Sequence, residues 1–205
     1  MATHSGAGEA SERQTYRFHP VTLRFIDRAV EQRFKRDHLL QALPIVRATF
    51  IGSILAYALF GVLDVTLIPE ARWLATWIRY GVVCPAVFVI FCLTYTKWFP
   101  QVAQLLFAFA MLFASLGIVA MTAAAGEPGR STYYAGIILV IIIGSSLVPV
   151  RWLVVTWSSA IIFLSYQVVV FLINPIAGFL RVNNDFFLAT AIMFGIAASY
   201  LHELR

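Results

Sequence analysis

Six long apolar runs, separated by short polar turns, fill most of this 205-residue chain. They cover about residues 39–63, 77–95, 102–125, 132–148, 151–173 and 185–204. A bilayer core roughly 30 Å thick takes about 20 apolar residues per helix, so each run has about the length of one membrane crossing. Only 12% of the residues are charged, whereas about 25% is usual in a soluble domain. We therefore predict an all-α integral membrane protein with six transmembrane helices within residues 38–199.

The segment before the first run has two parts. Residues 1–17 are small and polar, and we expect them to form a disordered tail. In residues 18–37, apolar side chains recur at helical spacing with basic residues between them. This pattern predicts an amphipathic helix on the inner membrane surface, whose basic residues face anionic lipid: Arg24, Arg28, Lys35 and Arg36. The alternative is that this helix docks on a partner or on a soluble domain.

The basic residues also predict the orientation. If both termini are cytoplasmic, 11 of the 15 basic residues lie on the inner side: Arg13, Arg17, Arg24, Arg28, Arg33, Lys35, Arg36, Arg47, Lys97, Arg151 and Arg205. The four on the outer side are then Arg72, Arg79, Arg130 and Arg181. This excess follows the positive-inside rule, so we expect both termini in the cytoplasm. The net charge of +5 is thereby explained by topology, and no nucleic-acid partner is expected.

Catalytic constellations are missing from the sequence. The four histidines lie in the N-terminal tail or near the cytoplasmic boundary, and no metalloprotease, nucleophile-elbow or P-loop spacing occurs. Cys84 and Cys92 would be about 12 Å apart along one helix, too far to form a disulfide with each other. We therefore expect no catalytic residue within this chain.

Acidic residues at the outer ends of the runs are the candidate binding residues. Asp64 ends the first run, Glu127 follows the third and Asp185 opens the sixth. If these helices are neighbours, their carboxylates meet at an outward-facing mouth and would bind a divalent cation or a small extracellular ligand. The alternative assigns each acid a structural role. Asp185 would then favour a helix N-terminus, Glu127 would be a solvated turn residue, and Asp64 would pair with Arg79.

The last run continues towards the C-terminus without a stop signal. Residues 199–205 are good helix formers and include no Gly or Pro. A helix that leaves the membrane in this way is typical of a domain that drives a cytoplasmic partner. We expect residues 200–205 to begin a signalling helix that contains Tyr200, His202, Glu203 and Arg205, and the chain to be a domain of a longer protein.

Three stretches resemble the six-helix membrane domain of bacterial class III nucleotide cyclases, chiefly the adenylate cyclases. They are Phe18-His19-Pro20 through Phe34-Lys35-Arg36, LAYALFGVLD at 55–64 and YLHELR at 200–205. The resemblance implies a bacterial inner-membrane location and an exit helix coupled to a homodimeric cytoplasmic cyclase domain. It also makes Asp64, Glu127 and Asp185 look like counterparts of acidic positions on the extracellular side. Similar six-span modules precede diguanylate cyclases and histidine kinases.

Two functions are compatible with these features. The first is the membrane anchor and sensor of a nucleotide cyclase in cAMP signalling, in which an extracellular or membrane cue changes the packing of the spans. The second is a small transporter or channel, with Asp64, Arg79, Glu127 and Asp185 lining an outer vestibule. A transport path needs polar residues at mid-depth, and internal repeats are usual in transporters. The runs carry no acidic residue at mid-depth and show no convincing repeat, so the first function is favoured.

Overall fold

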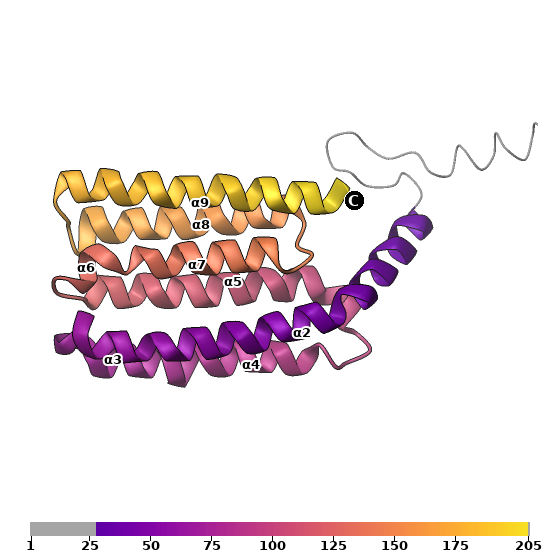
Figure 1. Cartoon of the computed structure of the whole chain (residues 1–205), viewed down its shortest axis with the longest axis horizontal. Coiled ribbons are helices and arrows are strands. Elements are labelled where there is room, and N and C mark those ends of the chain that lie inside the picture. The colour runs from indigo at the N-terminus through magenta and orange to yellow at the C-terminus, as the bar shows by residue number, and fades with distance from the viewer. Residues whose placement is uncertain (1–27, 205) are drawn as a thin grey trace, which may run out of the picture.

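The computed structural model describes residues 28–204, with side chains from Leu39 onward. Within that range the chain is helical, without strands, and its long helices lie side by side in an elongated bundle (Figure 1). Helices satisfy all their backbone hydrogen bonds internally, as an environment without water requires. The predicted tail, Arg24 and Arg205 lie outside the described residues, as do the side chains of Arg28, Lys35 and Arg36.

The long helical segments run along the bundle, and each one reverses the direction of the segment before it (Figure 1). The order is α2 (Arg28–Leu67), η1 (Pro69–Ala71), α3 (Arg72–Thr76), η2 (Trp77–Val83), α4 (Cys84–Leu93), α5 (Phe99–Ala124), α6 (Gly129–Thr132), α7 (Tyr134–Ser146), α8 (Trp152–Val168), η3 (Val169–Ile173) and α9 (Gly178–Leu204), with α3, η2 and α4 forming one continuous span and α8 and η3 another. The first residues of α2 and the last of α9 lie at the same end of the bundle (Figure 1). We call this end the exit end and the opposite end, where α2 stops, the Asp64 end.

Five helices in the described range are long and apolar enough to cross a membrane. They are Leu39–Leu67, Pro69–Leu93, Phe99–Ala124, Trp152–Ile173 and Gly178–Leu204. The predicted fourth crossing, about residues 132–148, corresponds to α7, which has 13 residues. A helix of that length is about 20 Å long, shorter than the bilayer core. The crossing by α7, and with it the total of six, therefore stays a prediction.

Helix α2 is longer than the predicted first span. It is continuous from Arg28, so part of the predicted surface helix and the first span share one helix. Its N-terminal end bends away from the bundle (Figure 1). Pro44 lies inside α2, and a proline within a helix removes one backbone hydrogen bond and usually produces a kink. The helix therefore leaves the bundle at an angle without a break in secondary structure.

Helix α7 is packed between α5 and α9. Its Ile137 and Ile141 are fully buried. Small residues on α9 allow the close approach, because Gly195 and Ser199 face α7 and a Cβ at Gly195 would lie 2.8 Å from Ser145 Oγ. A Cβ added at Gly52, on α2, would meet no neighbouring atom of the described residues within 4 Å. Small residues therefore shape the α7–α9 contact but leave the Gly52 face of α2 open.

Gly195→Ala is expected to destabilise the α7–α9 contact. The added methyl group would force Ser145 or Ile141 to move, and overpacking of this kind costs about 1–3 kcal/mol. Gly52→Ala is the matched control, because the same change in an open site should be neutral or stabilising by up to about 1 kcal/mol through helix propensity. Thermal unfolding of the purified variants measures the difference. Equal midpoints for the two variants would show that the α7–α9 contact tolerates a methyl group.

Candidate functional site

Arg79 and Asp64 form a bidentate ion pair inside the Asp64 end of the bundle. Arg79 Nε donates to Asp64 Oδ2 and Arg79 Nη2 donates to Asp64 Oδ1, both at 2.8 Å. The residues are only 2% and 3% exposed. Two buried opposite charges compensate each other, whereas either one alone would be strongly unfavourable there. This pairing is the structural role that the sequence offered as the alternative to a ligand site for Asp64.

Two tyrosines complete the hydrogen bonding of this pair. The Tyr133 hydroxyl donates to Asp64 Oδ1. The Tyr57 carbonyl oxygen accepts a 2.7 Å bond from Arg79 Nη1, and the guanidinium carbon lies 4.7 Å from the centre of the Tyr57 ring. We call these four residues the Asp64 cluster. It joins α2, η2 and the start of α7, so a movement of any one of these elements changes hydrogen bonds that the other two make.

Arg79 reaches the interior from a stretch of wider helix. It lies in η2, whose backbone forms π-helical turns over Trp77–Val83. Pro85 follows in the first turn of α4, and its ring would clash with the carbonyl of Gly81 in a regular α-helix. A π-helical turn relieves such a clash by adding a residue, and such turns are frequent at functional sites. The Gly81 and Pro85 spacing is the local reason that the second span is irregular at Arg79.

The other two predicted acids are placed elsewhere. Glu127 accepts hydrogen bonds from Ser131 and Arg130 in the turn before α6, and the Ser131 bond, followed by those of Arg130, lowers the pKa of its carboxyl group. Asp185 accepts a 2.7 Å bond from Gln167 Nε2. The predicted helix start at Asp185 was too late, because α9 begins at Gly178. Residues 178–184 belong to α9 because Asn184 is held inside the bundle, where its Nδ2 donates to the Ser131 carbonyl oxygen and to the Tyr166 hydroxyl.

The structure does not bring the three acids into one group. Each has its own partner, and in residues 28–204 no cluster of three His, Cys, Asp or Glu side chains is close enough to hold a metal ion. A cation at Asp64, Glu127 and Asp185 therefore stays a prediction from the sequence.

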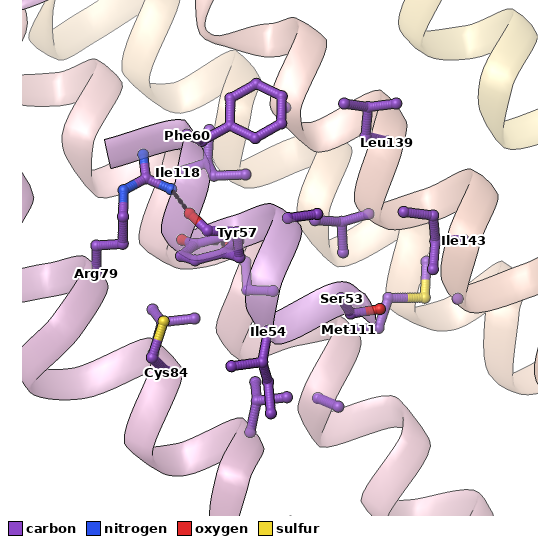
Figure 2. Close-up of a pocket in the computed structure, with 18 of the residues that line it drawn as sticks. Ser53, Ile54, Tyr57, Phe60, Arg79, Cys84, Met111, Ile118, Leu139 and Ile143 are labelled. Carbon is purple, nitrogen blue, oxygen red and sulfur yellow. Dashed lines mark hydrogen bonds between the residues drawn. The ribbon is translucent and has the colours of Figure 1, made fainter. Parts of the chain in front are cut away.

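A cavity of about 350 Å³ extends from the Asp64 cluster along the bundle. Figure 2 shows its wall, to which α2 contributes Ser53 and Tyr57, α5 contributes Met111, and α7 contributes Leu139 and Ile143. The lining is mostly apolar, and Arg79 lies at its edge (Figure 2). The volume is at the lower end of the range of small-molecule sites.

The cavity opens sideways between α2 and α7. Leu63 on α2 and Leu139 on α7 line it and are still 46% and 40% exposed. Both belong to apolar segments that run along the bundle, so the opening faces the hydrocarbon layer when the spans are in a bilayer. A ligand of this cavity would therefore enter from the membrane.

The exit end holds a second set of contacts, between α9 and the connection from α7 to α8. Arg151 Nη2 lies 2.7 Å from Glu203 Oε1, and the two side chains are 12% and 15% exposed. Ser199 Oγ donates to the Ser145 carbonyl at 3.1 Å, and His202 Nε2 lies 3.0 Å from the Ser146 carbonyl oxygen. We call this set the exit clamp. It ties the last turns of α9 to the end of α7 and the start of α8.

Aromatic packing supports the exit clamp. The rings of Trp152 and Tyr200 meet edge to face, with centroids 6.2 Å apart. The Trp152 backbone N–H also points to Glu203 Oε2, at 3.4 Å. Three of the residues singled out in the predicted signalling helix, Tyr200, His202 and Glu203, thus contact the same connection.

The family of the chain follows from a match over most of its length. A model of the family MASE8 matches residues 62–205, well over half of the chain. The chain belongs to the MASE8 family. MASE8 is a family of membrane-associated sensory domains. No curated protein and no solved structure matches the chain. The matched MASE8 region contains most of the Asp64 cluster and the whole exit clamp.

The two tyrosines of the Asp64 cluster are functional residues that the sequence does not single out. Tyr133 is an aromatic residue of the kind common at membrane interfaces, but it is buried, with only 8% of its surface exposed. A polar aromatic residue about two helical turns before Asp64 and another at the start of the next short helix are the available signals. Neither signal indicates a partner until the helices are placed side by side.

Proposed function

We propose that this MASE8 domain senses a cue at the membrane and passes it through α9 to a cytoplasmic output domain. The exit clamp carries this proposal, because it connects the last turns of α9 to the end of α7 through Ser199 and His202, and to the start of α8 through Glu203. A change in the position of α7 would change the contacts of Ser199 and His202. Such a movement needs differential binding of the cue to two arrangements of the helices.

The proposed topology has six crossings with both termini in the cytoplasm of a bacterial inner membrane. The excess of basic residues on the inner side supports it. The path of α7 also supports it, since Tyr133 before α7 bonds to Asp64 at one end of the bundle and Ser146 contacts His202 near the other. A short helix packed against longer neighbours can cross without spanning the full hydrocarbon thickness by itself.

The proposed output is an adenylate cyclase domain that works as a homodimer. The resemblance of residues 18–205 to cyclase membrane domains supports this choice, and diguanylate cyclases and histidine kinases are the alternative outputs. A transporter or channel has less support, because Asp64 and Arg79 are paired with each other and the cavity beside them is mostly apolar.

A fusion experiment tests the proposal. A class III cyclase catalytic domain attached after Arg205 should give membrane-bound activity that changes at least about twofold with bilayer composition or added ligand. The control replaces residues 1–205 by a soluble dimeriser, which should give activity without that response. If the two fusions respond identically under all conditions, sensing by this domain is rejected and only anchoring remains. A diguanylate cyclase fused at the same position tests the choice of output.

A further inference from the structure

The wall of the cavity has a regular polar pattern that the fold does not use. Thr49 and Ser53 lie one helical turn apart on the face of α2 that lines the cavity. Their hydroxyl groups form no hydrogen bond within the described part of the chain. The hydroxyl groups of Thr122 and Ser145, on other helices, donate to the carbonyl four residues earlier. Those of Ser115 and Ser159 also lack a partner among the described residues, but they are buried and do not line the cavity. Two hydroxyl groups with spare hydrogen-bonding capacity therefore face an otherwise apolar space.

The shape of the cavity restricts what it can hold. Its lining extends on α2 from Thr49 to Leu67, and on α7 and its flanking residues from Thr132 to Val148. At 1.5 Å per residue each wall is about 25 Å long. A volume of about 350 Å³ spread over that length makes a narrow channel rather than a round pocket. One extended hydrocarbon chain matches a space of this length and volume.

The charges at the Asp64 end of the cavity restrict the ligand further. Both oxygens of Asp64 are bound to Arg79, so the charge of the guanidinium group is already matched. A carboxylate or ammonium group on a ligand would enter without a free counter-charge, at a high desolvation cost. An uncharged hydroxyl or carbonyl group has a far smaller cost. It can also bond to Thr49 or Ser53.

We infer that the cavity binds a single uncharged long hydrocarbon chain, which enters from the bilayer between α2 and α7. This chain is either the acyl chain of a membrane lipid or a free long-chain alcohol or ester. The inference rests on the proposed function, because it names the kind of molecule that the domain senses. Binding is nevertheless measurable without any output domain, so its failure and that of signalling are distinguishable.

Photo-crosslinking on the full chain in lipid nanodiscs tests the inference. Three probes carry the same mid-chain diazirine on a palmitic-length chain: a free alcohol, a free acid kept ionised by alkaline buffer and a phosphatidylcholine. Labelled residues are identified by mass spectrometry. We expect the alcohol or the phosphatidylcholine chain to label the lining, including Leu139 and Ile143, and the ionised acid to label it at least about tenfold less.

Two variants separate the cavity from the general lipid surface. Ser53→Leu fills the cavity and should reduce labelling of its lining at least about fivefold. Gly52→Leu is the matched control. Gly52 precedes Ser53 in the sequence but faces open space, so this substitution should leave the labelling of the lining unchanged. Gly144→Ala is a milder filling variant, whose methyl group would meet Met111 Sδ at an ordinary contact distance of 3.7 Å. It should reduce labelling by about twofold and keeps the test valid if Ser53→Leu fails to fold.

Each outcome has a defined meaning. Labelling by the phosphatidylcholine chain identifies a bilayer lipid as the occupant, and labelling by the alcohol alone identifies a free long-chain molecule. The inference is overturned if no probe labels the lining, or if both filling variants are labelled like the wild type. Equal labelling by the acid and the alcohol would overturn the requirement for an uncharged ligand.

Discussion

Arg79→Ala is expected to lower the free energy of unfolding by about 3–5 kcal/mol, the usual loss when one partner of a buried ion pair is removed. The reason is that Asp64, 3% exposed, is left without its counter-charge, with the Tyr133 hydroxyl as the remaining side-chain donor among the described residues. Thermal or denaturant unfolding of the purified chain in a mild detergent measures the loss. Low expression or loss of the folded chain agrees with the same expectation.

Two controls make this expectation specific to the buried pair. Glu127→Gln breaks the pair with Arg130, whose side chains are 44% and 32% exposed, and should cost no more than about 1 kcal/mol. The double variant Asp64→Leu, Arg79→Met removes both charges and should recover at least half of the loss of Arg79→Ala. If Arg79→Ala is as stable as Glu127→Gln, the Asp64 cluster does not hold the first two spans together.

Glu203→Gln is expected to loosen the last turns of α9 without unfolding the bundle. Glu203 Oε1 lies 2.8 Å from Arg151 Nε and 2.7 Å from Arg151 Nη2. Hydrogen bonds between charged groups are worth about 1.5–3 kcal/mol, so amide exchange in residues 199–204 should become roughly 10- to 100-fold faster. Hydrogen–deuterium exchange followed by mass spectrometry measures the change.

The remainder of the chain supplies the comparison for Glu203→Gln. Amides of α5 and α7 should keep their exchange rates, because these helices also pack against each other, away from Glu203. Ala189→Ser, an exposed change on the same helix, should leave residues 199–204 as in the wild type. Unchanged exchange in Glu203→Gln would show that the exit clamp does not restrain α9, and the proposed route for the signal would lose its support.

Apolar length was sufficient to predict the helical class and most of the spans. The run at 151–173 matches the observed Trp152–Ile173, and the third run matches α5 within a few residues. The boundaries failed where polar residues belong to a helix. Asn183, Asn184 and Asp185 have the composition of a turn, but they lie inside α9 because Asn184 bonds to the Ser131 carbonyl and to Tyr166, and Asp185 bonds to Gln167.

The site was less predictable than the fold. The pairing of Asp64 with Arg79 could be stated from sequence as one alternative, because both residues lie near the connection between consecutive spans. The cavity could not, since it arises from the separation of α2 and α7, which depends on how both pack against α5. Helix neighbours in a membrane differ little in hydrophobicity, so no periodic pattern marks the side that faces a cavity.

The buried ion pair also has a consequence for how the protein enters the membrane. Arg79 has its counter-charge on the preceding span, so each helix carries an uncompensated charge until both are present. A single charged residue in a translocating helix costs about 2.5–3.5 kcal/mol at mid-depth and less near the ends. The translocation machinery would therefore release α2 and the following span together, as one helical hairpin, on which the later helices assemble.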